Sequence, residues 1–133
     1  MNASQNLTGL WKANLEKSKL LGPTPKAIAA KIRHDDPDLL VAMLITLADG
    51  AEHRIEFKGP TNGAEVFNLV SGQQWKSRMQ WIGEELLIES WVELAERKLH
   101  FRDFWFLSDN GKSLTMEHRD DDLRGQITFL ERS

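Results

Sequence analysis

The sequence predicts an all-β fold, an antiparallel up-and-down meander of about 8–10 strands. Turn-forming residues recur about every eight to twelve positions, the spacing typical of β-sandwiches and barrels. The segments between the turns are short and tend to alternate apolar with polar residues, as in strands with one buried face. The chain contains no cysteine, so disulfides cannot contribute to its stability.

The composition indicates a single globular domain, 1–133, long enough to bury a substantial core. Hydrophobic residues make up 41% and charged residues 28%, which is ordinary for a soluble protein. A net charge of -3 gives no broad attraction to nucleic acid or to an anionic membrane. The start of the chain lacks the pattern of a signal peptide, and the longest apolar run is too short to span a bilayer as a helix. We therefore expect a cytoplasmic protein with no nucleic-acid partner and no membrane partner.

The first strand is expected at the beginning of "LTGLWKANLEKSK" (7–19). The segment 14–26 looks irregular and leaves room for a short helix, which Pro23 and Pro25 would end. Further turn signals then divide the chain into hairpins. These signals are "HDDPD" (34–38), "ADGA" (48–51), "GPTNGA" (59–64), "SG" (71–72), "IGEE" (82–85), "SDNGK" (108–112) and "DDDLRG" (120–125).

The segment "EELLIESWVELAERK" (84–98) has two interpretations. Its periodicity alone favours an amphipathic helix. As two strands with a turn at Ala95-Glu96, it would instead complete a row of alternating charge across six strands, in which each directly opposed pair stabilises the sheet by about 0.2–1 kcal/mol. This row consists of Lys58, Glu65, Arg78, Glu89, Arg102 and Glu117. We therefore predict strands here.

The register that aligns these charges also defines the opposite face of the sheet. That face is mostly apolar and holds three of the five tryptophans, so it must be the inside; by the same parity Ile127 and Phe129 are expected to join it. The candidate ligand-binding residues on this face are His53, Phe57, Asn68, Trp75, Ser77, Met79, Trp81, Ser90, Phe101, Asp103, Trp105, Met116 and His118. The sequence assigns no catalytic residue, no metal ligand and no cofactor.

Asp103 and His118 are the most informative of these inward polar residues. The register places them on adjacent strands, directly opposite each other or one diagonal step apart. They could satisfy each other as buried polar groups, form the polar end of an apolar pocket, or act as an acid–base pair. No nucleophile is expected beside them, and His53 together with this pair matches no metal-site spacing.

Several stretches resemble a group of uncharacterised bacterial lipocalin-like proteins within the calycin class of β-barrels. In order along nearly the whole chain, they are "TGLWKANLEKSK", "IRHDDPDLLV", "NGAEVFN", "WIGEELLIES", "LSDNGKSLTMEHR" and "GQITFLERS". The resemblance implies a meander that closes into a barrel or a strongly curled sheet. It also implies an internal pocket for a small apolar ligand.

"GLW" (9–11) is similar to the Gly-x-Trp motif of calycins, which implies that Trp11 closes one end of the barrel against an arginine of the last strand. Arg132 is the best-placed arginine, whereas the register above points it outward. The sequence departs from fatty-acid-binding proteins in two respects. The segment 14–26 is too short for their helix-turn-helix lid, and "GQITFL" (125–130) lacks the Arg-x-Tyr that holds a fatty-acid carboxylate.

The predicted outer face has two apolar features that favour self-association. The strand "LLVAMLITL" (39–47) is apolar on both faces. A second group, flanked by Lys76 and His100, consists of Leu87, Trp91 and Phe104. Either the segment 14–26 covers these residues or the protein forms a homodimer.

The leading hypothesis is non-enzymatic binding of a small hydrophobic molecule in the barrel interior, with Asp103 and His118 at its polar end. The alternative is a packed barrel that acts as an oligomerising interaction protein without a ligand. An enzyme that uses Asp103 and His118 is the third possibility. The acidic turn 120–122 lacks the alternating oxygen ligands of a calcium loop, and we expect it to be a solvated hairpin end.

Overall fold

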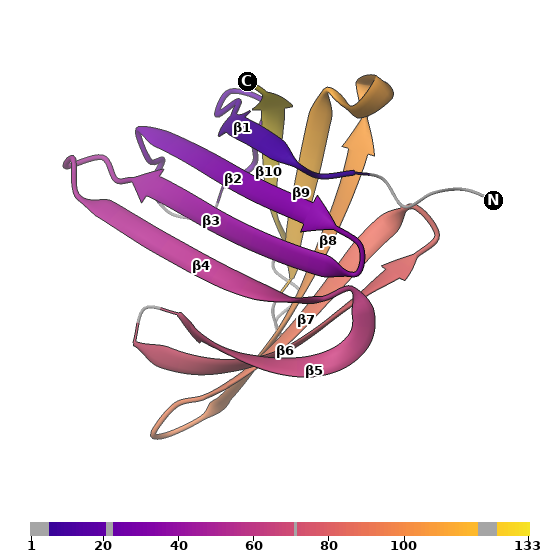
Figure 1. The fold of residues 1–133 in the computed structure, drawn as a ribbon. Helices are drawn as coiled ribbons and strands as arrows, with labels where there is room; N and C mark the ends of the chain where they lie inside the picture. The colour runs from indigo at the N-terminus through magenta and orange to yellow at the C-terminus, as the bar shows by residue number, and fades with distance from the viewer. Residues whose placement is uncertain (1–5, 21–22, 71, 120–124) are drawn as a thin grey trace.

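The computed structural model describes residues 6–20, 23–70, 72–119 and 125–133. Within these residues, ten antiparallel strands form one sheet (Figure 1), which confirms the predicted all-β meander. The strands are β1 (Gly9–Ala13), β2 (Ala27–Asp35), β3 (Asp38–Thr46), β4 (Glu52–Pro60), β5 (Asn62–Val70), β6 (Gln73–Ile82), β7 (Glu85–Glu93), β8 (Lys98–Ser108), β9 (Ser113–Arg119) and β10 (Gly125–Arg132). A short 3-10 turn, η1 (Asp109–Gly111), joins β8 to β9. No helix among the described residues has the length and apolar character needed to cross a membrane.

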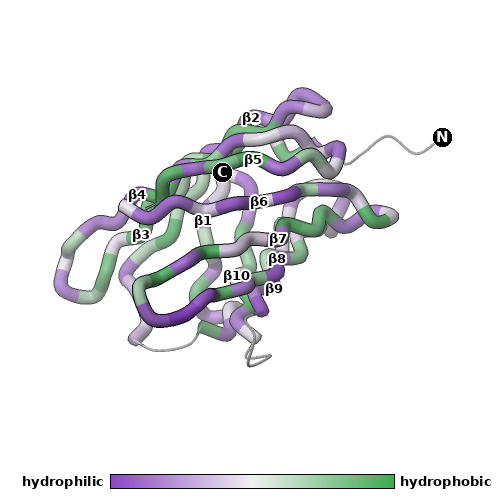
Figure 2. The backbone as a smooth tube through the Cα atoms, turned by 90° about the horizontal axis from the view of Figure 1, so that it is seen from below, coloured by the Kyte–Doolittle hydropathy of each residue, from purple (hydrophilic) through white to green (hydrophobic). Residues whose placement is uncertain are grey.

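The strand order makes the sheet a nearly closed barrel. Along the sheet the order is β4-β3-β2-β1-β10-β9-β8-β7-β6-β5, so the first and last strands pair and join the two halves of the chain. The two free edges of the sheet are β4 and β5, which follow each other in sequence and meet along a seam without a backbone ladder. Hydropathy alternates along the strands, as Figure 2 shows in a view from below, because one face of each strand is buried in the barrel.

The central part of the predicted charge row is confirmed. Arg78 lies opposite Glu65 on one side and Glu89 on the other, and Glu89 lies opposite Arg102. The segment 84–98 therefore forms β7, a turn and the start of β8, rather than a helix. In that turn the backbone N–H of Leu94 donates to the carbonyl of Arg97 at 2.8 Å.

Both ends of the charge row were predicted wrongly. Arg102 lies opposite Arg119, not Glu117, because the β8–β9 turn is centred one residue later than the sequence suggested, which moves the pairing by two residues. A two-residue shift keeps each side chain on its face, and Glu117 instead binds the guanidinium of Arg119 at 2.7 Å. Lys58 and Glu65 do not pair, because the seam interrupts the ladder between β4 and β5.

The parity of β10 also differs from the prediction. Thr128 lies opposite Met116 and Leu130 opposite Leu114, so Thr128 and Leu130 face the interior. Ile127 and Phe129, predicted to point inward, therefore lie on the outer face. A shift of one residue reverses every side chain of a strand. The connection that sets this register, 120–124, lies outside the described residues, as does the predicted acidic turn.

The corrected parity turns Arg132 toward Trp11, as the calycin resemblance implied. The Arg132 guanidinium lies over the Trp11 ring, 4.2 Å from its centroid, and donates to the backbone carbonyls of Thr8 and Gly111. Gly9 has a φ of +148°, which other residues rarely adopt, and a Cβ atom there would come within 2.5 Å of this guanidinium, so both the backbone and the contact favour glycine. Trp11 is buried, and together these groups close one end of the barrel.

The segment between β1 and β2 continues along β10 and does not form the expected short helix within its described residues. Lys19 forms an isolated β-bridge with Ile127, and the ammonium of Lys17 lies over the ring of Phe129, 5.1 Å from its centroid. These contacts partly cover the two side chains that β10 turns outward. The segment therefore acts as an edge extension of β1.

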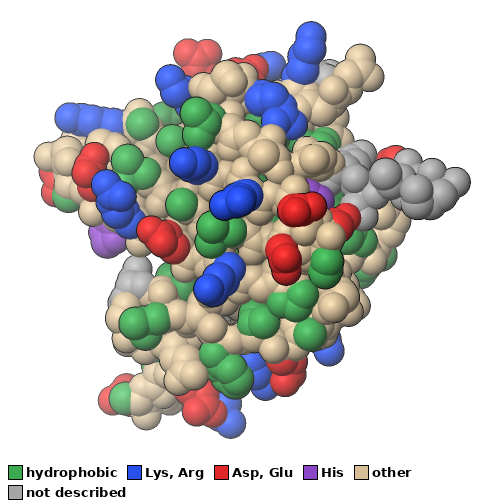
Figure 3. All heavy atoms as spheres, viewed as in Figure 1, with side chains coloured by type: hydrophobic (Ala, Val, Ile, Leu, Met, Phe, Trp, Pro, Cys, Tyr) green, Lys and Arg blue, Asp and Glu red, His purple; other side chains and the backbone are tan. Residues whose placement is uncertain are grey.

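The outer face of β3 explains why 39–47 is apolar on both parities. Leu40 lies between Arg33 of β2 and Lys58 of β4, so long charged side chains flank the apolar stripe on both sides. Figure 3 shows this mixture of basic, acidic and hydrophobic side chains over β2, β3 and β4. The aliphatic stems of such residues can cover neighbouring apolar surface while their charges stay hydrated.

Glu89 is the centre of an ionic cluster on the outer face of β6, β7 and β8. Its carboxylate accepts hydrogen bonds from Arg78 at 2.9 Å and from His100 at 3.1 Å, and Arg102 lies 3.7 Å away. Burial alone would raise the pKa of Glu89, but the hydrogen bonds and charges of Arg78 and His100 hold this pKa below its ordinary value of 4.5. The ionised form therefore stabilises the sheet.

Acid is expected to remove this stabilisation. Because the folded-state pKa of Glu89 is depressed, its contribution is complete above about pH 4.5 and is lost as the pH falls through the folded-state pKa. Glu89→Gln should lower the free energy of unfolding by about 1 kcal/mol at pH 7, and by progressively less toward pH 3. Urea denaturation across this range measures the difference. Glu96→Gln, in the exposed turn, should have little effect; an equal loss from Glu89→Gln at every pH would contradict the argument.

Candidate ligand-binding cavity

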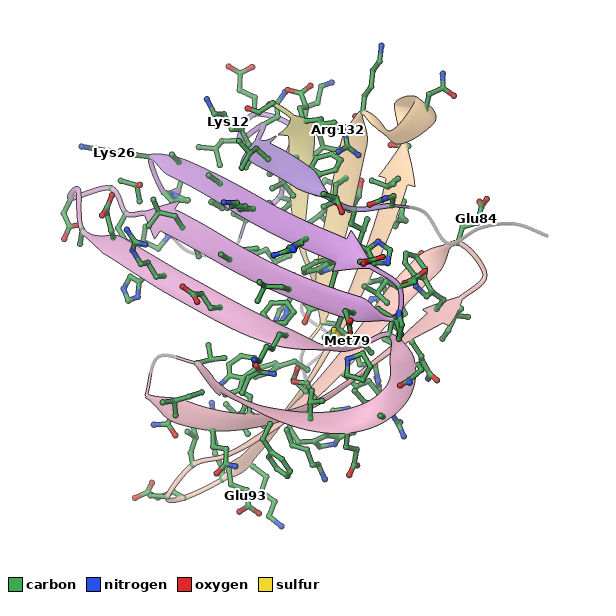
Figure 4. The ribbon with its side chains drawn as sticks, viewed as in Figure 1. Lys12, Lys26, Met79, Glu84, Glu93 and Arg132 are labelled. Carbon is green, nitrogen blue, oxygen red and sulfur yellow. The ribbon has the colours of Figure 1, made fainter. Side chains whose placement is uncertain are left out.

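A cavity of about 570 Å³ occupies the end of the barrel opposite Trp11. Figure 4 shows Arg132 at the closed end, Glu93 at the other end and Met79 between the walls. The lining comes from inward residues of strands β3 to β10 and from the β7–β8 turn. These residues are Met43, Ile45, Ile55, Phe57, Asn68, Val70, Gln73, Trp75, Ser77, Ile88, Ser90, Val92, Leu94, Leu99, Phe101, Asp103, Trp105, Met116, His118, Gln126 and Thr128. Small-molecule sites typically have volumes of about 300–1,000 Å³.

The hydrophobic core ends at the cavity and forms its floor. Ile88, Trp105 and Met116 belong both to the cavity lining and to the buried core cluster, which fills the barrel down to Trp11. The barrel is therefore packed solid in one half and hollow in the other. The core fixes the position of the strands, and the halves of these strands that lie beyond the core form the cavity walls.

Aromatic rings form a continuous part of the wall. Trp75 stacks on Phe101 with ring centroids 5.5 Å apart, and Phe101 in turn contacts His118 at 5.2 Å. Across the interior, Phe57 meets Trp105 edge-on at 6.0 Å. Offset and edge-on arrangements of this kind are favourable and hold the rings in fixed orientations.

Asp103 and His118 form the polar end of this aromatic wall. They lie directly opposite each other on β8 and β9, and Nδ1 of His118 is 2.8 Å from a carboxylate oxygen of Asp103. Their side chains are 23% and 34% exposed, respectively, so both remain accessible from the cavity. The hydrogen bond between them satisfies part of the hydrogen-bonding capacity of both side chains, and both line the cavity.

Three other polar side chains of the wall are hydrogen bonded to protein atoms. The hydroxyls of Ser77 and Ser90 hydrogen bond to each other at 2.9 Å across β6 and β7. Asn68 spans the seam: its amide oxygen accepts from the backbone N–H of Lys58, and its amide nitrogen donates to the backbone carbonyl of Lys58, both at 3.0 Å. One side chain therefore replaces a backbone pair between β4 and β5.

Ten of the thirteen candidate residues line the cavity. The three others are His53, Met79 and Trp81. Met79 is buried in the solid half of the barrel, and Trp81 packs near His34 at the closed end. His53, near the start of β4, is exposed. Strand parity identifies the buried face, but it does not say how far along the barrel each residue lies.

Sequence reasoning missed several lining residues. Met43 and Ile45 were hidden because their strand is apolar on both faces, and Gln126 and Thr128 were hidden by the one-residue error in β10. Met43 and Ile45 could have been found from the pairing of 39–47 with 52–60, because this pairing places Met43 opposite the inward residue Ile55.

A second polar cluster, which the sequence did not reveal, ties the N-terminal segment to the closed end. Nδ1 of buried His34 accepts the backbone N–H of Leu7 at 3.1 Å, so the ring proton must reside on Nε2, which faces Asp36. The Thr61 hydroxyl donates to the same Asp36 oxygen at 3.1 Å. This arrangement positions Leu7 in the core. Among the described residues no three His, Asp or Glu side chains converge as a metal site would require.

Comparisons with known proteins identify the fold. No protein-family model matches the sequence, and no curated protein matches it. Secretory abundant heat soluble protein 4 from Ramazzottius varieornatus has a similar solved structure, with a TM-score of 0.72 at 12% identity over 100% of this chain and 99% of that chain. A secretory abundant heat soluble protein from the same organism, crystallised from a dimer sample, gives 0.67 at 14% identity over 99% and 98%.

These identities are low enough that the likeness concerns the fold alone. It confirms the predicted lipocalin-like β-barrel. The resemblance to a particular bacterial group stays a prediction.

The seam offers a direct test of the role of Asn68. Asn68→Asp keeps the acceptor for the Lys58 N–H but places a carboxylate oxygen against the Lys58 carbonyl. We expect a loss of about 1–3 kcal/mol in the free energy of unfolding and faster hydrogen exchange at the Lys58 amide. Asn62→Asp is the control, because Asn62 uses its side-chain oxygen as an acceptor for Ala64. Equal stability of the two variants would refute the role of Asn68.

Proposed function

We propose that this chain is a non-enzymatic binding protein that holds a small, mainly apolar molecule in the cavity. The observation that carries the proposal is a hollow of about 570 Å³ whose lining residues are mostly aromatic and aliphatic, with a minority of polar side chains. This combination is typical of small-molecule sites. The lipocalin-like barrel fold is consistent with it.

The division of the barrel into a solid and a hollow half supports binding over the alternative of a fully packed interior. The core cluster at the closed end already provides a continuous hydrophobic centre. A cavity of this size is larger than the few voids that well-packed interiors contain. Its walls include large rings, such as Trp75 and Phe101, that could bury a ligand.

The hydrogen-bond pattern supports binding over catalysis. An Asp–His pair can act as a general base, but nucleophilic catalysis also needs an activated hydroxyl within reach of the imidazole. The two serine hydroxyls of the cavity, Ser77 and Ser90, bond to each other. We therefore assign Asp103 and His118 the role of orienting a polar head group.

Tryptophan fluorescence tests the proposal. Titration with 1-decanol and with retinol should change the emission of the protein, because Trp75 lines the cavity. Trp75→Phe should reduce this response, whereas Trp91→Phe, on the outer face, should leave the ligand-induced change in place. A wild-type protein that responds to neither probe and binds neither in calorimetry would refute the proposal.

A second candidate property is homodimerisation through the outer face of β5. Phe67 and Leu69 point outward on this edge strand and are 63% and 72% exposed. The group first suggested is less accessible: Leu87 is buried, and cations cover the rings of Trp91 and Phe104. Adjacent exposed apolar side chains favour association. One similar structure came from a dimer sample of its own protein.

Light scattering coupled to size-exclusion chromatography tests this second candidate. The wild-type protein should elute as a dimer, and Phe67→Glu should convert it to a monomer because the charge would be buried at the interface. Leu10→Glu is the control, since Leu10 is 56% exposed but lies on β1. A monomeric wild type at high concentration would exclude this interface.

A further inference from the structure

The charges in the cavity are one-sided. Asp103 is the single carboxylate among the described lining residues, and that lining includes neither lysine nor arginine. On β6 and β8, Arg78 and Arg102 point to the outer face, where both lie close to Glu89. An anionic head group would therefore meet a negative charge, and no cation, among the lining residues that the structure describes.

His118 does not reverse this asymmetry. Its Nδ1 is hydrogen bonded to Asp103, so a proton on the ring would be shared with that carboxylate. The pair then carries a charge of zero when the imidazole is protonated and -1 when it is neutral. In neither state does it offer the net positive charge that would hold a carboxylate.

The aromatic wall adds a second, independent preference for positive charge. Trp75, Phe101 and His118 follow one another in contact and end at Asp103. The faces of aromatic rings attract cations, and this attraction strengthens in a poorly hydrated site. A ligand could lie with its apolar body along the rings and its head group at the carboxylate.

From this arrangement we infer that the cavity selects an apolar amine in its ammonium form over a fatty acid, with Asp103 as the acceptor for the ammonium group. The inference rests on the proposed binding function and gives it a chemical class of ligand. It also separates this chain from barrels that hold a fatty-acid carboxylate, since the last strand has no Arg-x-Tyr.

Three probes that share one alkyl chain test the inference: decylammonium, 1-decanol and decanoate. Isothermal titration calorimetry at neutral pH, below the micelle concentration of each probe, should rank decylammonium first and decanoate last. We expect decylammonium to bind at least about tenfold more tightly than decanoate, as one charge-assisted hydrogen bond would produce. Asp103→Asn should lower the affinity for decylammonium about tenfold and leave that for 1-decanol within about twofold.

The outcomes separate the inference from the function on which it rests. Asp38→Asn, an identical change of an exposed residue at the closed end, should leave all three affinities unchanged. Tightest binding of decanoate by the wild-type protein would overturn the ammonium preference while the binding function stands. Binding of none of the probes would remove both. An ammonium preference that survives in Asp103→Asn would overturn the assignment of Asp103, and retained 1-decanol binding shows that this variant has folded.

Discussion

The pairing of the first strand with the last is the constraint on which the rest of the structure depends. β1 and β10 join segments more than a hundred residues apart, and Arg132 holds the junction by covering Trp11 and binding the carbonyls of Thr8 and Gly111. Without this pairing the meander would be an open sheet, and its apolar face would lack an inside. The close approach of Arg132 to Gly9 shows how tightly the junction is packed.

The two ends of the barrel differ in packing, because the core cluster fills one end and the cavity occupies the other. At the closed end, polar groups such as His34 and Asp36 bind backbone and side-chain partners and position Leu7 in the core. At the hollow end, Asp103 and His118 bond to each other and remain partly exposed. Each of these four side chains has a hydrogen-bond partner, and Asp103 and His118 are the two that line the cavity.

The sequence predicts the meander and about half of the cavity lining because the charge row is periodic and each tight turn fixes a register. Glu89, with arginines opposite on both sides, distinguishes strand from helix in 84–98. The predictions fail at the two hairpins where the position of the turn was wrong or could not be fixed from turn residues. The β8–β9 turn lies one residue later than predicted, which puts Arg119 rather than Glu117 opposite Arg102, and the pairing of β10 with β9 turns Ile127 and Phe129 outward. The position of a residue along the barrel axis produces no periodic pattern in the sequence, so it could not be predicted.

The seam between β4 and β5 lets the circumference of this barrel vary. Separating any other pair of neighbouring strands would break a ladder of backbone hydrogen bonds. Across the seam, the side chain of Asn68 makes two hydrogen bonds to the backbone of Lys58. Asn68 also lines the cavity, so a ligand too large for the cavity would strain the same two hydrogen bonds. The barrel can thus open along the seam between β4 and β5 while the other neighbouring strands stay paired.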